Sequence, residues 1–269
     1  MKTKQEVLAV DGDIVAYRTA AVCEDHFEGA CEEIIDTTLR EVSTETNIHK
    51  MRIYISGEDN FRYKIAKSKP YKGNRATMVR PRFLAHCKQY LVDNYNALVI
   101  HGYEADDAIA SDMTLNNAYH CGIDKDMLQI PGRHYNYVNK EWKTVSPEEA
   151  IVTLYRQILT GDSSDNIPGL PRVGPKTAEG IITDHDTAHA DAMAYYEQVC
   201  IEKLPDVKWQ EYFWEQSALI TMVKDIDLLS LFTVYVEPKT EGFETQVGED
   251  IPDSEYTPKA RVEKVKPKI

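Results

Sequence analysis

The stretch "ALVIHGYEADDAIASDMTLNNAYHCGID", residues 97–124, contains two apolar runs on either side of a segment with helical spacing. The first run, 97–102, is typical of a buried strand, and 119–123 is typical of another. Between them, 104–113 has the length and pattern of a short helix. A strand–helix–strand order favours a mostly parallel α/β sheet.

The same alternation extends toward the N-terminus. Further strands are expected at 7–10 and 52–56, and helices at 30–42 and 81–95. We therefore expect an α/β fold with a mostly parallel central sheet flanked by helices.

Acidic residues follow three of the expected strands. Asp11 ends the first, Glu104 lies just past another and Asp124 follows a third. In open α/β sheets, ligands bind at the carboxyl ends of the strands. We expect these three carboxylates to share one pocket.

More carboxylates lie beside these or follow a helix that is expected to end at Gly161. The additional candidates are Asp106, Asp107, Asp126, Asp162 and Asp165. Oxygen ligands select Mg²⁺ or Mn²⁺ rather than Zn²⁺. Two such ions about 3.5–4 Å apart activate water and stabilise the leaving oxygen in phosphoryl displacement. Unrelated surface acids would explain any one group, but they explain all four groups poorly.

The net charge of −13 argues against nucleic-acid binding until its distribution is considered. Residues 60–92 hold nine Lys or Arg and no Asp or Glu. Such segregation of charge suits a basic DNA-binding surface beside an acidic metal-binding pocket. The alternative is a basic surface that is simply solvated.

The hairpin "NIPGLPRVGPKTA" lies between the last acidic pair and an expected helix. It contains Gly169 and Gly174, and the helix opens with Lys176 and Thr177. Backbone N–H groups at such a helix start bind phosphate, and Lys176 adds positive charge. This grip would contact the nucleic-acid backbone without selecting a base sequence.

The C-terminal half is more helical, with helices expected at 147–160, 186–203 and 209–230. The expected divisions are a catalytic domain at 1–160, a helical region at 161–238 and a flexible tail at 239–269. Five scattered cysteines without a C-x-x-C pair indicate reduced thiols. With no signal peptide or membrane span recognised, we expect a cytoplasmic protein without membrane contact.

The motifs "VDGD", "YKGNR", "EADD", "DKD" and "LTGDSSDNIPG…GPKTA" resemble the flap endonuclease/5′-to-3′ exonuclease family in order and spacing. The resemblance covers roughly residues 6–238 and is strongest to the stand-alone bacteriophage exonucleases of that family. It implies a PIN-like 5′-nuclease fold with a basic helical arch at about 57–85 and a helix–three-turn–helix. It also implies Mg²⁺-dependent hydrolysis of DNA at 5′ ends, flaps and duplexes in phage-type DNA replication, primer removal or recombination, with RNA–DNA hybrid as a further substrate.

The same resemblance implies roles for individual residues. Lys72 and Arg75 would engage the scissile phosphate, while Tyr71 would stack on a base or serve as a core tyrosine. Arg62 would contact DNA, and K⁺ would bind at the helix–three-turn–helix. The eight carboxylates implied around two metal ions are Asp11, Glu104, Asp106, Asp107, Asp124, Asp126, Asp162 and Asp165.

Two positions depart from the family pattern. Gly57 stands where many relatives have an aspartate after the second strand, and Glu58 or Asp59 is the candidate replacement. Arg172 stands where the hairpin usually has glycine, which predicts a different local geometry.

Two other functions compete with a nuclease. A haloacid-dehalogenase-type phosphatase would use Asp11 as nucleophile and Asp13 as general acid/base. A non-catalytic DNA-binding module would need only the basic stretch and the hairpin. His185 and His189 are expected to be exposed histidines rather than zinc ligands. The protein is expected to be a monomer, with the basic tail as a solvated segment or a contact for DNA or a replication partner.

Overall fold

The computed structural model describes residues 6–226, and these residues contain a six-stranded sheet in the order β3-β2-β1-β4-β5-β6. Neighbouring strands run parallel except β5 and β6, which pair antiparallel. The strands are β1 Leu8–Asp11, β2 Met51–Ser56, β3 Leu98–Ile100, β4 Tyr119–Cys121, β5 Gly132–Asn136 and β6 Glu141–Val145. The predicted α/β fold with a mostly parallel sheet is confirmed.

Strand β1 lies in the middle of the sheet, between β2 and β4. Val10 pairs with Ile53 on one side and with Cys121 on the other. Strands β2 and β3 lie on one side of β1. Strands β4, β5 and β6, which come later in the chain, lie on the other side. The carboxyl end of β1 is therefore the topological switch point, where open α/β sheets bind ligands.

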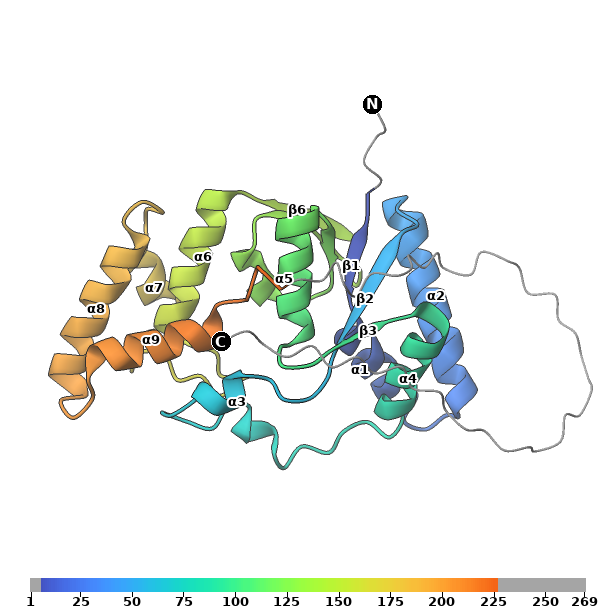
Figure 1. Cartoon of the computed structure of the whole chain (residues 1–269), viewed down its shortest axis with the longest axis horizontal. Coiled ribbons are helices and arrows are strands. Elements are labelled where there is room, and N and C mark those ends of the chain that lie inside the picture. Colours follow the sequence, from blue (N-terminus) through green and yellow to red (C-terminus); the bar gives the residue numbers. More distant parts are fainter. Residues whose placement is uncertain (1–5, 227–269) are drawn as a thin grey trace, which may run out of the picture.

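Helices cover both faces of the sheet (Figure 1). Leu8 and Val10 pack against α1, α2 and α4, whereas Ala9 between them packs against α5 and η2. This alternation follows from the two-residue period of a strand. The covering helices are α1 Gly12–Val22, α2 Glu28–Thr46, α4 Leu84–Tyr95, α5 Ala105–Asn116 and the 3₁₀ helix η2 Lys125–Gln129.

A separate apolar core holds a helical region beside the sheet, at the left of Figure 1. Its helices are α6 Pro147–Thr160, α7 Pro175–Ile181, α8 Ala188–Lys203 and α9 Trp209–Ile220. Helix α6 begins with a reciprocal capping box between Ser146 and Glu149, as its sequence predicts. Ile158 and Leu159 at its other end belong to the core shared with α8 and α9.

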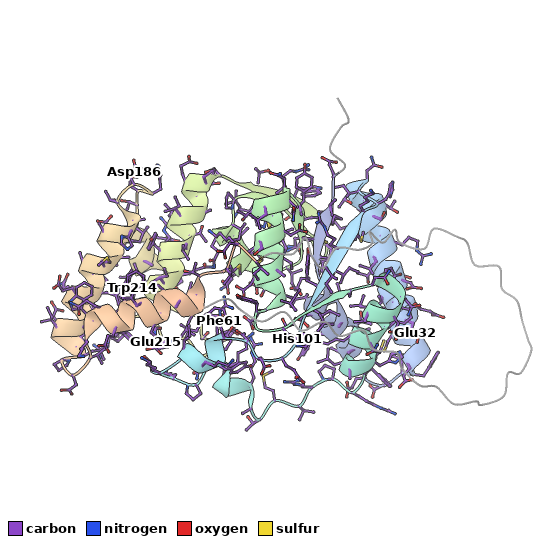
Figure 2. The ribbon with its side chains drawn as sticks, viewed as in Figure 1. Glu32, Phe61, His101, Asp186, Trp214 and Glu215 are labelled. Carbon is purple, nitrogen blue, oxygen red and sulfur yellow. The ribbon has the colours of Figure 1, made fainter. Side chains whose placement is uncertain are left out.

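The basic segment 57–85 crosses between the helical region and α4 with little helix of its own. It contains one helical turn, α3 Arg62–Ile65, and one 3₁₀ turn, η1 Gly73–Arg75. The expected helical arch is thus an irregular strap over most of its length. Glu215 of α9, labelled in Figure 2, anchors the strap by accepting hydrogen bonds from the backbone N–H of Lys67 (2.6 Å) and Ser68 (2.7 Å).

Three expectations need correction. Strands β5 and β6 are absent from the expected elements, because neither of their sequences, GRHYN and EWKTV, contains a long apolar run. Helix α1 was also missed. The helix expected at 209–230 ends at Ile220, and 221–226 is not helical. The tail expected at 239–269 lies outside the described residues, and no described helix is long and apolar enough to span a membrane.

Candidate metal-dependent active site

The strand ends place acidic side chains through helix capping. Asp11 ends β1 and caps α1, its Oδ1 accepting the N–H of Ile14 at 3.0 Å. Glu104 caps α5, and Asp124 caps η2 by accepting the N–H of Asp126 at 2.8 Å. A carboxylate at a helix start is favoured by the free N–H groups and the helix dipole. Each acid that was predicted at a strand end therefore also has a local role, because it caps the helix that follows.

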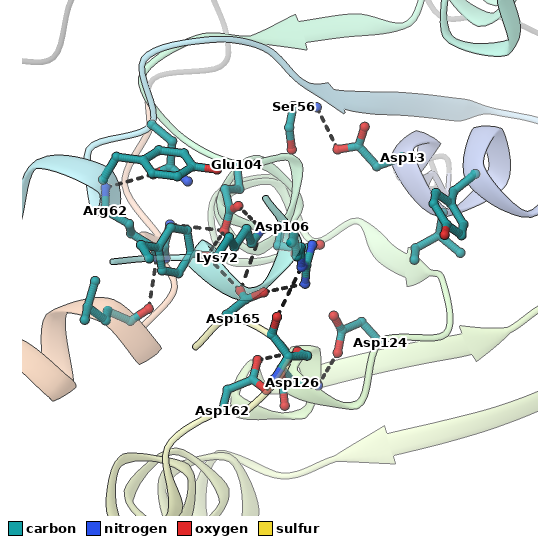
Figure 3. Close-up of a pocket in the computed structure, with 18 of the residues that line it drawn as sticks. Asp13, Ser56, Arg62, Lys72, Glu104, Asp106, Asp124, Asp126, Asp162 and Asp165 are labelled. Atoms are coloured by element: carbon teal, nitrogen blue, oxygen red, sulfur yellow. Dashed lines mark hydrogen bonds and ion pairs between the residues drawn. The ribbon is translucent and has the colours of Figure 1, made fainter. Parts of the chain in front are cut away.

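These caps line a cavity of about 890 Å³ at the carboxyl edge of the sheet (Figure 3). Glycine at position 161 ends α6 with φ of 67°, and Asp162 follows it into the cavity. Seven of the eight predicted carboxylates line this cavity: Asp11, Glu104, Asp106, Asp124, Asp126, Asp162 and Asp165.

Two of the seven carboxylates are compensated by cations of the strap, and we call this group the paired side. Lys72 forms an ion pair with Glu104, and Arg75 pairs with Asp165 at 2.5 Å. The hydroxyl of Tyr71 lies 2.8 Å from both carboxylates. Burial alone would raise the pKa of Glu104, but attraction to Lys72 and other cations lowers it overall.

The other five carboxylates form what we call the open side: Asp11, Asp106, Asp124, Asp126 and Asp162. Among the described residues, no lysine or arginine forms an ion pair with any of them. Burial and repulsion from Asp13 raise the pKa of Asp11 to about 7. Burial and repulsion from Asp124 and Asp162 raise the pKa of Asp126 to about 7.

This excess of negative charge fits divalent cations, and the all-oxygen donor set fits Mg²⁺ or Mn²⁺. No three of these carboxylates have ligand atoms all within 4.8 Å of one another; within residues 6–226 only Asp184, His185 and Asp186 meet that criterion. The open side therefore surrounds a space instead of converging on a point. Mg²⁺ commonly retains several waters and contacts only one or two carboxylates, so a wide ring suits it.

Asp107 and Arg62 have a role different from the predicted one. Asp107 is fully buried and outside the cavity lining, and both its oxygens accept from Arg62, at 2.6 and 2.8 Å. Only 4% of the Arg62 side chain is exposed, and it also donates to the carbonyls of Leu219 and Thr221. Metal binding by Asp107 and DNA contact by Arg62 do not fit this burial; the pair joins the strap to α5 and to the end of α9.

Tyr71 adopts the second of its two predicted roles, because it is 4% exposed and bound to the paired side. Its ring packs edge-on against Tyr63, with ring centres 5.3 Å apart. Tyr63 also lines the cavity and is 58% exposed. Tyr63 is thus an exposed aromatic side chain of the cavity lining, as is Tyr17, which is 41% exposed.

Neither candidate replacement for the missing aspartate lines the cavity, since Glu58 and Asp59 are exposed outside it. A Cβ at Gly57 would lie 2.8 Å from His101 Nδ1, so this backbone has no room for an acid there. The carboxylate beside this corner is Asp13, which accepts from Ser56 N–H at 2.8 Å.

Asp13 also forms an ion pair with Lys88 at 2.5 Å. The phosphatase hypothesis requires Asp13 to exchange a proton with a substrate, whereas here both of its oxygens are engaged by protein groups. The hypothesis also gives no role to the acids that follow Glu104 and Asp124. The geometry disfavours it.

The hairpin keeps its turn despite the change from glycine. Arg172 has φ of 66°, so a non-glycine residue occupies the left-handed region that glycine normally favours. Gly169, also left-handed, lies against Gly161, where an added Cβ would come within 2.3 Å of Gly161 N. Lys176 and Thr177 are exposed at the start of α7.

The two histidines weighed as zinc ligands do not act together. His189 packs between the rings of Tyr155 and Phe213, 5.6 and 5.9 Å away. His185 lies with Asp184 and Asp186 on the far side of the helical region, outside the cavity lining (Asp186 is labelled in Figure 2).

No family model matches the chain. A curated 5′-3′ exonuclease of Buchnera aphidicola (subsp. Schizaphis graminum) is 29% identical over 199 residues, covering 65% of this chain and 69% of that protein. The thermostable DNA polymerase I of Thermus aquaticus is 29% identical over 210 residues, covering 70% of this chain but only 25% of the polymerase. Among solved structures, the T5 D15 protein co-crystallised with metal ions matches with a TM-score of 0.56, 17% identity and coverage of 84% and 88%. A complex of the bacteriophage T5 D15 flap endonuclease with DNA and metal ions matches equally well. The structural matches establish a shared fold, and the sequence matches agree with the resemblance seen in the motifs.

Proposed function

We propose that this chain, a relative of the 5′-3′ exonucleases, is a divalent-metal-dependent nuclease that hydrolyses phosphodiester bonds at DNA 5′ ends and flaps. The observation that carries the proposal is the division of one cavity into five uncompensated carboxylates and a paired side with Lys72 and Arg75. A phosphodiester needs cations for its oxygens, and the metal ions that supply them need carboxylates. The direction of attack is taken from the names of the relatives.

The open side would hold the metal ions. Asp11 and Asp126 fit this role best. Asp11 is buried and Asp126 is half-buried, neither forms an ion pair with a lysine or arginine of the described residues, and the pKa of each is raised. Bound Mg²⁺ or Mn²⁺ would supply Lewis acidity toward a phosphodiester oxygen and toward water. The T5 protein with bound divalent zinc supports a divalent site in this fold.

Lys72 and Arg75 would hold the scissile phosphate and balance the charge that develops on it. Both lie on the strap at the cavity wall, and 45% of the Arg75 side chain is exposed. Tyr63 would stack on a base of the strand that enters the cavity. The nine Lys or Arg of residues 60–92, a segment without Asp or Glu, complement the negative charge of this strand.

A second contact would grip the duplex at the hairpin between α6 and α7. Gly174 caps α7 and leaves open space around it, since nothing lies within 4 Å of a Cβ there. Lys176 and Thr177 are exposed beside it, so a phosphate has access to the backbone N–H groups. We place the K⁺ ion implied by the resemblance at the same hairpin. The T5 complex with DNA supports DNA binding by this fold.

The cellular role proposed for the chain is that of a monomeric, stand-alone nuclease in phage-type replication, with RNA–DNA hybrid as a further substrate. A partner protein bound through the C-terminal tail belongs to this proposal, and the tail lies outside the described residues.

The test uses duplex DNA labelled separately at each end, with and without a 5′ flap, incubated in Mg²⁺ or in EDTA. Asp126→Ala removes a carboxylate of the open side. Asp186→Ala removes an exposed carboxylate outside the cavity and serves as the matched control. We expect release from the labelled 5′ end in Mg²⁺ only, lost in Asp126→Ala and kept in Asp186→Ala.

Intact DNA in every reaction of the folded protein would overturn the proposal. Binding without cleavage, unchanged by EDTA, would instead identify a DNA-binding module. Cleavage that survives in Asp126→Ala would remove the open side from the mechanism.

A further inference from the structure

Two glutamines, one buried and one half-buried, connect the open side to the end of α9. Gln157 of α6 donates through Nε2 to Asp126 Oδ1 at 2.8 Å, and its Oε1 accepts from Gln129 Nε2 at 3.2 Å. Gln129 is 1% exposed and lies in η2, the 3₁₀ helix that also carries Asp126. We call this pair the amide relay.

The backbone determines which way each amide points. Gln129 Oε1 accepts the N–H of Met222 at 2.9 Å, and a backbone N–H can only donate. The Nε2 group of Gln129 must therefore face the other side, where it donates to the Ile220 carbonyl at 3.1 Å and to Gln157 Oε1. Because Gln157 uses its oxygen toward Gln129, its N–H group is left pointing at Asp126.

This donor suits a carboxylate that must also bind a cation. Asp126 has no described lysine or arginine within ion-pair distance, and its neighbours Asp124 and Asp162 repel it. A neutral amide donor orients Asp126 through Oδ1 without adding positive charge that would compete with a metal ion. Hydrogen bonds from outer groups to ligating carboxylates generally fix their orientation and raise metal affinity.

We propose that Gln157 is a positioning residue that holds Asp126 for divalent-cation binding, and that Gln129 fixes the direction of this hydrogen bond from the backbone at 220–222. The choice of cation rests on the proposed nuclease function. The amide relay connects Asp126 to the backbone at 220–222. The orientation of the Asp126 carboxylate therefore depends on the conformation of the segment that follows α9.

The experiment measures Mn²⁺ binding to the full chain without DNA, by electron paramagnetic resonance of the free ion. Gln157→Met keeps the side-chain length and removes the donor. Gln198→Met makes the same change at an exposed glutamine of α8 that bonds to Glu202 outside the cavity. We expect Gln157→Met to weaken Mn²⁺ binding by about 10- to 100-fold. Gln198→Met should leave it unchanged.

A double-mutant cycle separates positioning from a general effect on the fold. In an Asp126→Ala background the donor has no carboxylate to orient, so Gln157→Met should change the remaining Mn²⁺ affinity by less than about twofold. If Gln157→Met does not fold by circular dichroism, Gln157→Asn replaces it. The shorter amide cannot reach both partners, and the same loss is expected.

Unchanged Mn²⁺ affinity in the folded Gln157 variant, with binding intact in the parent, would overturn the amide relay alone. Equal weakening in the Asp126→Ala background would overturn it as well, because the effect would not pass through Asp126. Absence of Mn²⁺ binding in the folded parent would overturn the metal site of the proposed function and this inference with it.

Discussion

The paired side and the open side of the cavity contain the same kind of carboxylate in different surroundings. On the paired side, Lys72, Arg75 and the Tyr71 hydroxyl satisfy Glu104 and Asp165 from within the chain. On the open side, the five acids have no such ion pairs among the described residues. The difference shows that carboxylates lining one cavity differ in how far the chain itself compensates their charge.

The largest expected effect comes from removing one charge of the open side. Asp11→Asn should keep the fold, because asparagine also caps a helix, and should lower nuclease activity by about 10³-fold. Asp13→Asn changes a neighbouring carboxylate that is already engaged by Lys88 and Ser56, and should cost less than about tenfold. Initial rates on end-labelled DNA in saturating Mg²⁺ measure both.

The reverse order, with Asp13→Asn inactive and Asp11→Asn active, would contradict the division of the cavity. It would also return the phosphatase hypothesis to consideration, since that mechanism depends on Asp13.

Buried and exposed arginines should differ in their effect on stability. Arg62→Met leaves Asp107 charged and buried without its partner, so we expect a loss of about 3–5 kcal/mol in the free energy of unfolding. Arg75→Met removes a cation whose side chain is 45% exposed, and we expect a loss of no more than about 1 kcal/mol. Urea unfolding monitored by circular dichroism measures both.

Equal costs for the two substitutions would show that the Arg62–Asp107 pair does not join the strap to α5 and α9. Arg75→Met should still reduce cleavage, because the proposed phosphate contact is lost.

Metal binding should stabilise the protein most at alkaline pH. The pKa values of Asp11 and Asp126 rise from 3.8 to about 7 on folding, so the cation-free folded chain binds more protons than the unfolded chain between these values. The stability that protonated Asp11 and Asp126 contribute to the folded state is therefore lost as the pH rises through about 7. Mg²⁺ at about 100 times its Kd should restore about 2.7 kcal/mol at pH 8, raising Tm by about 5–10 °C.

At pH 6 protons compete with the cation for the same carboxylates, and the Mg²⁺-induced rise in Tm should be smaller. Differential scanning calorimetry at both pH values, with NaCl at matched ionic strength as the control, checks the expectation. An equal or larger rise at pH 6 would show that the open side does not bind the ion.

The sheet and its acidic edge could be predicted because strand ends and apolar runs are local signals. The runs at 7–10 and 97–102 mark buried parallel strands, and the acids after them follow directly in the chain. Strands β5 and β6 escaped because an edge hairpin with exposed polar residues has no such run. Helix α1 escaped because it begins directly after β1 with Gly12, and glycine is a poor helix former.

The roles of single acids could not be predicted where a distant partner decides them. Asp106 and Asp107 are adjacent, yet one lines the cavity and the other is buried against Arg62, 45 residues away. No spacing rule distinguishes them, because the ion pair forms only when the strap crosses α5. Similarly, Gln157 carries no sequence motif, and its contact with Asp126 depends on how α6 packs against η2.

The smallest effect concerns the mouth of the paired side, where Tyr63 and Tyr71 pack edge-on but differ in exposure. Tyr63→Ala removes the exposed ring, and the loss of one base stack should weaken binding of single-stranded DNA by about tenfold. Trp214→Ala removes a similarly exposed ring of α9 (64%, against 58% for Tyr63) that does not line the cavity, and it should leave binding unchanged (Trp214 is labelled in Figure 2). Fluorescence anisotropy in EDTA measures affinity without cleavage. Equal weakening by both variants would mean that aromatic exposure alone, and not position at the paired side, determines contact with the strand.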